Sequence, residues 1–149
     1  MHMGKTVIVS LIVAATTIAA AGGELDHKEK RAFAQKTYLD GAIKSIADKK
    51  QCGFAVDAGV QWDTFKFDDK NSENNAAMMC SRVLSEISFV CRRSADGKAA
   101  VQGKIKRVSC SYSETEATTI SDGVVTARYG FGTLKGYNDR VAKALKDQL

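Results

Sequence analysis

The amino-acid sequence predicts a single α+β domain in which helices pack on a small antiparallel sheet, in the order α-β-α-β-β-α. The chain has 149 residues, of which 44% are hydrophobic and 26% charged, as in a globular domain. Its apolar residues switch between helical and alternating spacing, which predicts both helices and strands. It carries four cysteines, an even number that predicts two disulfides, and no proline, which excludes proline-rich linkers.

Residues 1–21 are predicted to be a secretory signal peptide. Lys5 supplies a positive charge, residues 7–21 carry no charge, and three alanines precede Gly22 as a small-residue cleavage site. A membrane anchor is the competing interpretation, but these 15 uncharged residues fall short of the roughly 20 that a spanning helix needs. We therefore expect an exported protein, periplasmic or secreted, without a stable membrane anchor after cleavage.

The remaining residues, 22–149, show no internal repeat and no second zone of composition, so we predict one domain. Met1 and His2 are interpreted as a cloning remnant ahead of a native start at Met3; a start at Met1 is the alternative.

The first element of this domain is predicted to be a long amphipathic helix over residues 24–50. Leu39, Ile43, Ile46 and Ala47 recur at helical spacing and should face the core. Two lysines at the end of the segment and a glycine shortly after them favour termination there.

The spacing of apolar residues then changes to two, which predicts a strand over residues 54–62. Its inward residues all have even numbers: Phe54, Val56, Ala58, Val60 and Trp62. The parity breaks at Asp63 and Thr64, where we expect a bulge or turn. The polar residues 68–75 should form a loop that supplies an N-cap to the next helix.

The strongest helical pattern comes next, with apolar residues at steps of three and four. These residues are Ala76, Cys80, Val83, Ile87 and Val90, with Leu84 and Cys91 alongside. Residues 92–103 are predicted to form a turn or a short helix. Alternating residues then predict a second strand over 108–112 and, after a polar loop and Asp122-Gly123, a third over 125–131. A last helix should begin at about Asn138, with Val141, Ala144 and Leu145 facing inward.

Helix geometry selects the disulfide pairing. Cys80 and Cys91 lie on one helix, roughly 16 Å apart along its axis, whereas a disulfide requires Cα atoms within about 7 Å. The helix should return antiparallel to the first strand, which brings Cys91 towards Cys52, and the next strand reverses again, which brings Cys110 to Cys80. We therefore predict Cys52–Cys91 with Cys80–Cys110; Cys52–Cys80 with Cys91–Cys110 is the alternative.

Little in the sequence points to catalysis or to a cofactor. The cysteines show no metal-binding spacing, and the glycines at 97–103 and 130–136 miss the phosphate-binding and dinucleotide motifs by one residue. His27 lies in the first turn of a charged helix, where we expect it to be solvated. A compact carboxylate-based hydrolase is an alternative, with candidate acids Asp57, Asp63, Glu86 and either Glu114 or Glu116.

Charge is unevenly distributed, on a chain whose net charge is +5. Residues 92–107 contain six basic side chains and one acidic one; the basic ones are Arg92, Arg93, Lys98, Lys104, Lys106 and Arg107. Such a segment binds anionic polymers or steers acidic partners, unless it is simply a solvated surface. No aromatic residue interleaves it, so we do not expect nucleic-acid binding.

These observations predict a small exported, disulfide-stabilised module that binds a protein or an anionic polymer and performs no chemistry of its own. An inhibitor or immunity protein directed against a secreted enzyme is the first alternative, and the hydrolase is the second. The sequence predicts no oligomeric state.

Overall fold

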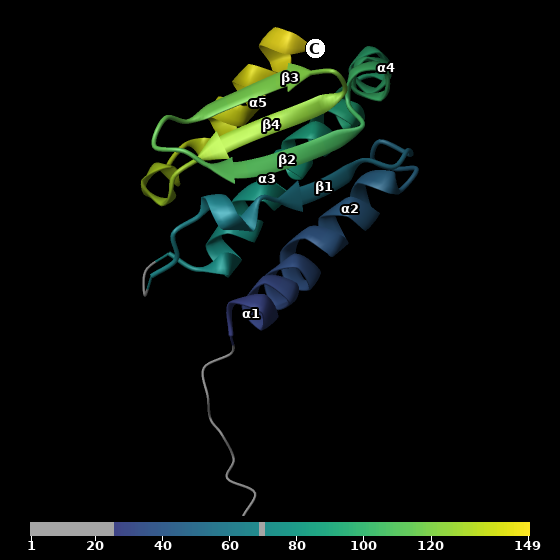
Figure 1. Ribbon diagram of the computed structural model, residues 1–149. Coiled ribbons are helices and arrows are strands. Elements are labelled where there is room, and N and C mark those ends of the chain that lie inside the picture. The colour runs from purple at the N-terminus through teal and green to yellow at the C-terminus, as the bar shows by residue number, and fades with distance from the viewer. Residues whose placement is uncertain (1–25, 69–70) are drawn as a thin grey trace, which may run out of the picture.

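The computed structural model describes residues 26–68 and 71–149 and confirms an α+β fold (Figure 1). One face of a four-stranded sheet is covered by helices α3 and α5, and helices α1 and α2 pack on α3 as a further layer. The opposite face of the sheet carries exposed side chains, among them Arg107, Thr119 and Arg128. The predicted signal peptide, residues 1–21, lies outside the described residues.

The first helical segment has three parts: α1 (His27–Ala34), a π-helical turn (Gln35–Leu39) and α2 (Asp40–Ala47). The π turn fits the five-residue step between the buried side chains of Ala34 and Leu39, which a regular helix would place on different faces. Ile46 is buried as predicted, but the prediction that Ala47 faces inward is wrong. Ala47 lies about 100° around the helix from Ile46, towards solvent.

Strand β1 (Asp57–Val60) is followed by a 3-10 turn (Trp62–Thr64), as the break in parity predicts. The inward positions Val56, Ala58 and Val60 are buried. The strand is shorter than the predicted 54–62, because it pairs only with β2 and over four residues.

Helix α3 (Glu73–Arg93) is the central helix, and every residue of its predicted apolar stripe is buried except Val90, which is half-buried. The hydroxyl oxygen of Ser72 caps its N-terminus by accepting a hydrogen bond from the backbone of Asn75. The predicted short helix is α4 (Ala95–Lys104), which begins directly after α3. The two helices meet closely, since a Cβ atom at Gly97 would lie 2.7 Å from the carbonyl oxygen of Val90.

The sheet has the strand order β1-β2-β4-β3, so the prediction of an antiparallel sheet is wrong. Strands β1, β2 (Arg107–Tyr112) and β4 (Val124–Tyr129) are parallel, and only β3 (Ala117–Ser121) is antiparallel to its neighbour β4. The physical reason is that α3 and α4 carry the chain back along the sheet, so that β2 starts from the same end as β1.

Strand β3 was not predicted, and it forms a hairpin with β4 around Asp122 and Gly123. Both turn residues have positive φ angles, 52° and 81°, as in the two-residue turns that favour Asp-Gly. The edge of β3 is covered by the side-chain amide of Gln148. Its oxygen accepts a hydrogen bond from the backbone of Ile120 (2.7 Å), and its nitrogen donates to the carbonyl of Thr118 (2.9 Å).

Helix α5 (Tyr137–Gln148) buries Val141 and Leu145 as predicted. Its N-cap is Gly136, whose φ of 69° places it in the left-handed region, and not the predicted Asn138. The reason is that Tyr137 must enter the core at the first helical position, which requires the helix to begin two residues earlier than predicted.

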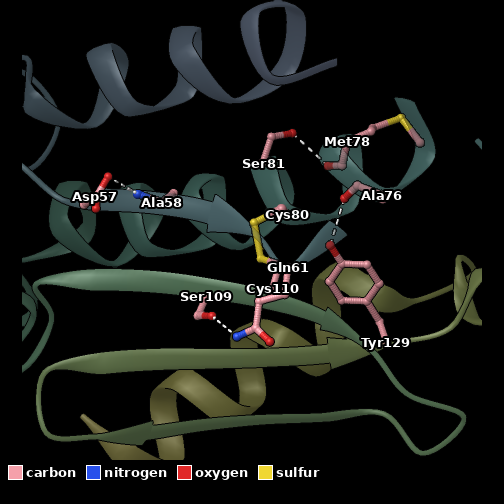
Figure 2. The surroundings of a disulfide bond; sticks show 10 residues. All are labelled: Asp57, Ala58, Gln61, Ala76, Met78, Cys80, Ser81, Ser109, Cys110 and Tyr129. Carbon is pink, nitrogen blue, oxygen red and sulfur yellow. Dashed lines mark hydrogen bonds between the residues drawn. A yellow bond between two sulfur atoms is a disulfide. The ribbon is translucent and has the colours of Figure 1, made fainter. Parts of the chain in front are cut away.

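Both predicted disulfides are present. Cys52 is bonded to Cys91, with their Cα atoms 5.1 Å apart, and Cys80 to Cys110, with a Cα separation of 5.8 Å. The second bond joins α3 to β2 (Figure 2). The two disulfides therefore fasten different parts of α3, one to the chain before β1 and the other to the middle of the sheet.

Candidate functional site

The six basic residues at 92–107 differ in the contacts that their side chains make. Lys104 donates hydrogen bonds from Nζ to the carbonyl oxygens of Gln148 (2.9 Å) and Leu149 (2.6 Å), and so holds the end of α5. The guanidinium of Arg107 lies 3.9 Å from the Asp57 carboxylate on the open sheet face.

Two more members of this segment pack against loops: Lys98 lies beside Gly53, and Lys106 beside Gly123. That leaves Arg92 and Arg93 as neighbours at the end of α3. Their guanidinium carbons lie 5.9 and 6.0 Å from the ring centre of Phe89, within the range of cation–π interactions. Phe89 is a large apolar side chain with 48% of its surface exposed.

Phe89 borders a groove between α3, α4 and α5, which we call the α3–α4–α5 groove. Its volume is about 650 Å³. The apolar part of its lining consists of Phe89, Val90, Ala100, Ala142 and Leu149. An apolar hollow of this size with an exposed ring beside it has the character of a binding site.

The groove is polar at both ends but with different charges. Tyr129 contacts both Tyr137 at the start of α5 and the carbonyl of Ala76 near the start of α3, so the two helices run in the same direction. Glu86 therefore lies at one end of the groove, whereas Arg93, Asp96 and Lys146 line the other.

At the end of the groove that contains Glu86, the pKa of this carboxyl group is raised, mainly by burial and to a lesser extent by the charge of Asp139. Lys143 also lines the groove, and it is paired with Asp147 at 2.5 Å. At the opposite end two cations, Arg93 and Lys146, outnumber the one carboxylate of the lining, Asp96.

The candidate acids for a hydrolase lie in different places. Asp57 is on the open sheet face beside Arg107, Asp63 is 3.2 Å from the guanidinium of Arg31, and Glu114 is exposed in the loop after β2. Glu116 forms two hydrogen bonds with Arg140, at 2.6 and 2.9 Å, and these raise the pKa of Arg140. The structure does not bring these carboxylates together around a common point.

His27 forms a contact that sequence reasoning missed. Although 66% of its side chain is exposed, its Nδ1 atom lies 2.6 Å from the carboxylate of Glu73, of which only 4% is exposed. The two residues are 46 positions apart, and no sequence signal pairs them. A histidine oriented by a carboxylate can act as a base, but the pair itself supplies no nucleophile. We assign it a structural role, in which it ties the start of α1 to the start of α3.

The carboxyl ends of parallel strands are the usual ligand sites of open α/β sheets. Here this edge is filled by aromatic side chains that we call the aromatic end: Trp62, Phe65, Phe67, Tyr112, Tyr129 and Phe131. The buried ring of Phe65 is at its centre and lies within 5.6–5.9 Å of four of the other rings. This end of the sheet is therefore occupied by packed aromatic rings, unlike the α3–α4–α5 groove.

Among residues 26–68 and 71–149, no cluster of three or more potential metal ligands occurs. Nor is any helix in the described part of the chain long and apolar enough to cross a membrane. Comparisons with protein families, with curated proteins and with solved structures found no match to this chain.

Proposed function

We propose that this protein is a small exported binding module whose α3–α4–α5 groove takes a segment of a partner protein. The segment carries an apolar side chain that packs on Phe89 and an acidic side chain that pairs with Arg93 and Lys146. The observation that carries this proposal is the exposed ring of Phe89, flanked by two arginines at the mouth of an apolar groove.

Export is supported by the two disulfides, which persist in oxidising compartments and are rare in the cytosol. It is also consistent with the predicted signal peptide at residues 1–21. In an oxidising compartment a domain of this kind keeps a rigid shape, so little entropy is lost when a partner binds to a preformed groove.

A protein segment suits the groove better than an anionic polymer does. A polymer would require a row of free cations, whereas Lys104 holds the end of α5 and Arg107 faces Asp57 on another surface. The groove instead combines an apolar floor with both signs of charge, since the carboxylates of Glu86 and Asp96 line it beside Arg93 and Lys146. Aromatic and arginine side chains are also enriched among the residues that dominate binding energy at protein interfaces.

Selection from a phage-displayed library of random peptides tests this proposal. We expect enriched peptides with an aromatic or aliphatic residue next to Asp or Glu, and loss of their binding in Phe89→Ser. Phe33→Ser is the matched control, because Phe33 is 55% exposed on α1, away from the groove.

Peptides that bind Phe89→Ser as well as the unchanged protein would contradict the proposal, as would enrichment of basic peptides or no enrichment. A tight complex with one secreted enzyme, lost with the same substitution, would assign the inhibitor role within this binding class.

A further inference from the structure

A second and smaller cavity lies between α2 and α3, next to Arg92. Its volume is about 180 Å³. Its polar lining consists of Ser45, Gln51, Ser85, Ser88 and Arg92, and its apolar lining of Ala42, Ile46 and Leu84. No carboxylate occurs among the described residues that line it, so the cavity differs in chemistry from the α3–α4–α5 groove.

The hydrogen bonds within this cavity leave donors available. The hydroxyl of Ser88 donates to the side-chain oxygen of Gln51, which fixes the amide and leaves the two N–H groups of Gln51 for other acceptors. Arg92 contributes a guanidinium, which can offer two parallel N–H donors to an oxyanion. Ser45, on α2, adds a hydroxyl from the opposite wall.

A disulfide holds these donors in place. Gln51 precedes Cys52 and Arg92 follows Cys91, so the bond between the two cysteines fixes the spacing of the amide and the guanidinium. The loop is also fastened to α2, because the backbone N–H groups of Cys52 and Gly53 lie 3.1 and 3.3 Å from the carbonyl oxygen of Ile46. The donors are thus arranged before any ligand binds.

We propose that this cavity binds a small tetrahedral oxyanion, a phosphate or sulfate group, either free or at the end of a larger molecule. Arg92 supplies the charge, and Gln51 and Ser45 supply further donors. The C-terminal ends of α2 and α3 lie nearby, and their dipoles oppose the binding of an anion. We therefore expect binding of inorganic phosphate to be weak, on the order of millimolar, about 4 kcal/mol.

Nuclear magnetic resonance titration of the labelled protein with sodium phosphate and sodium sulfate, at constant ionic strength set with sodium chloride, tests this proposal. We expect saturable shifts at Ser45, Gln51, Ser88 and Arg92. Arg92→Gln should weaken binding at least tenfold, and Ser45→Ala by a smaller factor. Arg93→Gln is the matched control, since it removes the same charge one residue away, where the side chain faces the groove instead.

An equal effect of Arg92→Gln and Arg93→Gln would overturn the proposal, as would shifts that chloride reproduces or that do not saturate. A parallel titration with O-phosphoserine distinguishes the two sources of the oxyanion. Binding tighter than that of inorganic phosphate would indicate the end group of a larger ligand, and equal or weaker binding the free ion. Failure of the peptide selection would leave this result unaffected, because Phe89 and Arg93 line the α3–α4–α5 groove and not this cavity.

Discussion

The two ends of helix α3 differ in how they meet their surroundings. At the N-terminal end, Glu73 is buried and paired with His27, and the hydroxyl of Tyr129 donates to the carbonyl of Ala76 at 2.8 Å (Figure 2). The aromatic rings of Phe65 and Phe67 pack beside these residues. At the C-terminal end, Phe89 is exposed, and Arg92 and Arg93 stand beside two cavities. One helix thus has a closely packed end and an exposed end, and the proposed binding sites lie at the exposed end.

The proposed sites do not lie at the end of the sheet where an α/β protein most often binds ligands. Phe65 and its neighbours have filled that edge with apolar side chains, whose burial stabilises the fold. The opposite end of α3 is fastened by Cys52–Cys91 and needs no aromatic cluster to hold it. Its surface is consequently available for a partner.

The largest expected difference between the two ends of α3 appears when one aromatic ring is removed from each. Phe65→Ala should cost about 3–5 kcal/mol of unfolding free energy, because it removes a buried ring in contact with four others. Phe89→Ala should change the unfolding free energy by less than about 0.5 kcal/mol, since the ring is half exposed. Urea unfolding measures both, and similar losses at the two sites would show that the two ends are not divided in this way.

Removing each disulfide in turn separates effects on stability from effects on phosphate binding. Cys80→Ala/Cys110→Ala and Cys52→Ala/Cys91→Ala should each cost about 2–4 kcal/mol, because they release loops of similar length, 30 and 39 residues. Only the second pair of substitutions should also weaken phosphate binding, because only that bond holds Gln51 beside Arg92. Equal phosphate binding in the two variants would contradict this division.

His27→Ala tests the N-terminal end of α3, with a smaller expected loss of stability. It leaves the buried carboxylate of Glu73 without its histidine partner, which should cost about 1–3 kcal/mol in thermal or urea unfolding. The double variant His27→Ala/Glu73→Gln should recover part of this loss, because the unpaired charge is then gone. A double variant no more stable than His27→Ala would show that the carboxylate is not the source of the cost.

The smallest expected effect is at the groove, where burial and the charge of Asp139 raise the pKa of Glu86. A carboxyl group whose pKa is raised by folding binds its proton more tightly in the folded state. Its contribution to stability is therefore complete below the ordinary pKa of 4.5 and is lost as the pH rises through the raised value. Glu86→Gln should thus stabilise the protein at pH values above the raised pKa and leave it unchanged well below 4.5. An equal effect of the substitution at both pH values would contradict this assignment.

The sequence predicted the features that depend on local spacing. The apolar stripe of α3 is regular over several turns, and the rise of a helix alone excludes a bond between Cys80 and Cys91. The predicted disulfide pairing requires β2 to run in the same direction as β1, because the chain reverses twice between them. The antiparallel sheet was therefore inconsistent with the disulfides that the same sequence predicted.

The remaining features depend on contacts between distant residues. Strand β3 lies at the edge of the sheet and has no clear alternation of apolar residues by which it could be predicted. Hydrogen bonds with the side-chain amide of Gln148 help to hold it in place. The pair His27–Glu73 joins helices far apart in the chain. The groove requires three helices to be placed before Phe89 has a hollow beside it, although the position of Phe89 outside the apolar stripe already indicated an exposed ring.

Nuclear magnetic resonance mapping of a selected peptide on the labelled protein tests most directly whether binding takes place at the C-terminal end of α3 and not at the aromatic end. We expect chemical-shift changes at Phe89, Arg93 and Ala100, and along α5 as far as Lys146, with little change at Trp62 and in the rest of the aromatic end. Changes centred on the aromatic end, with the α3–α4–α5 groove unaffected, would contradict this expectation.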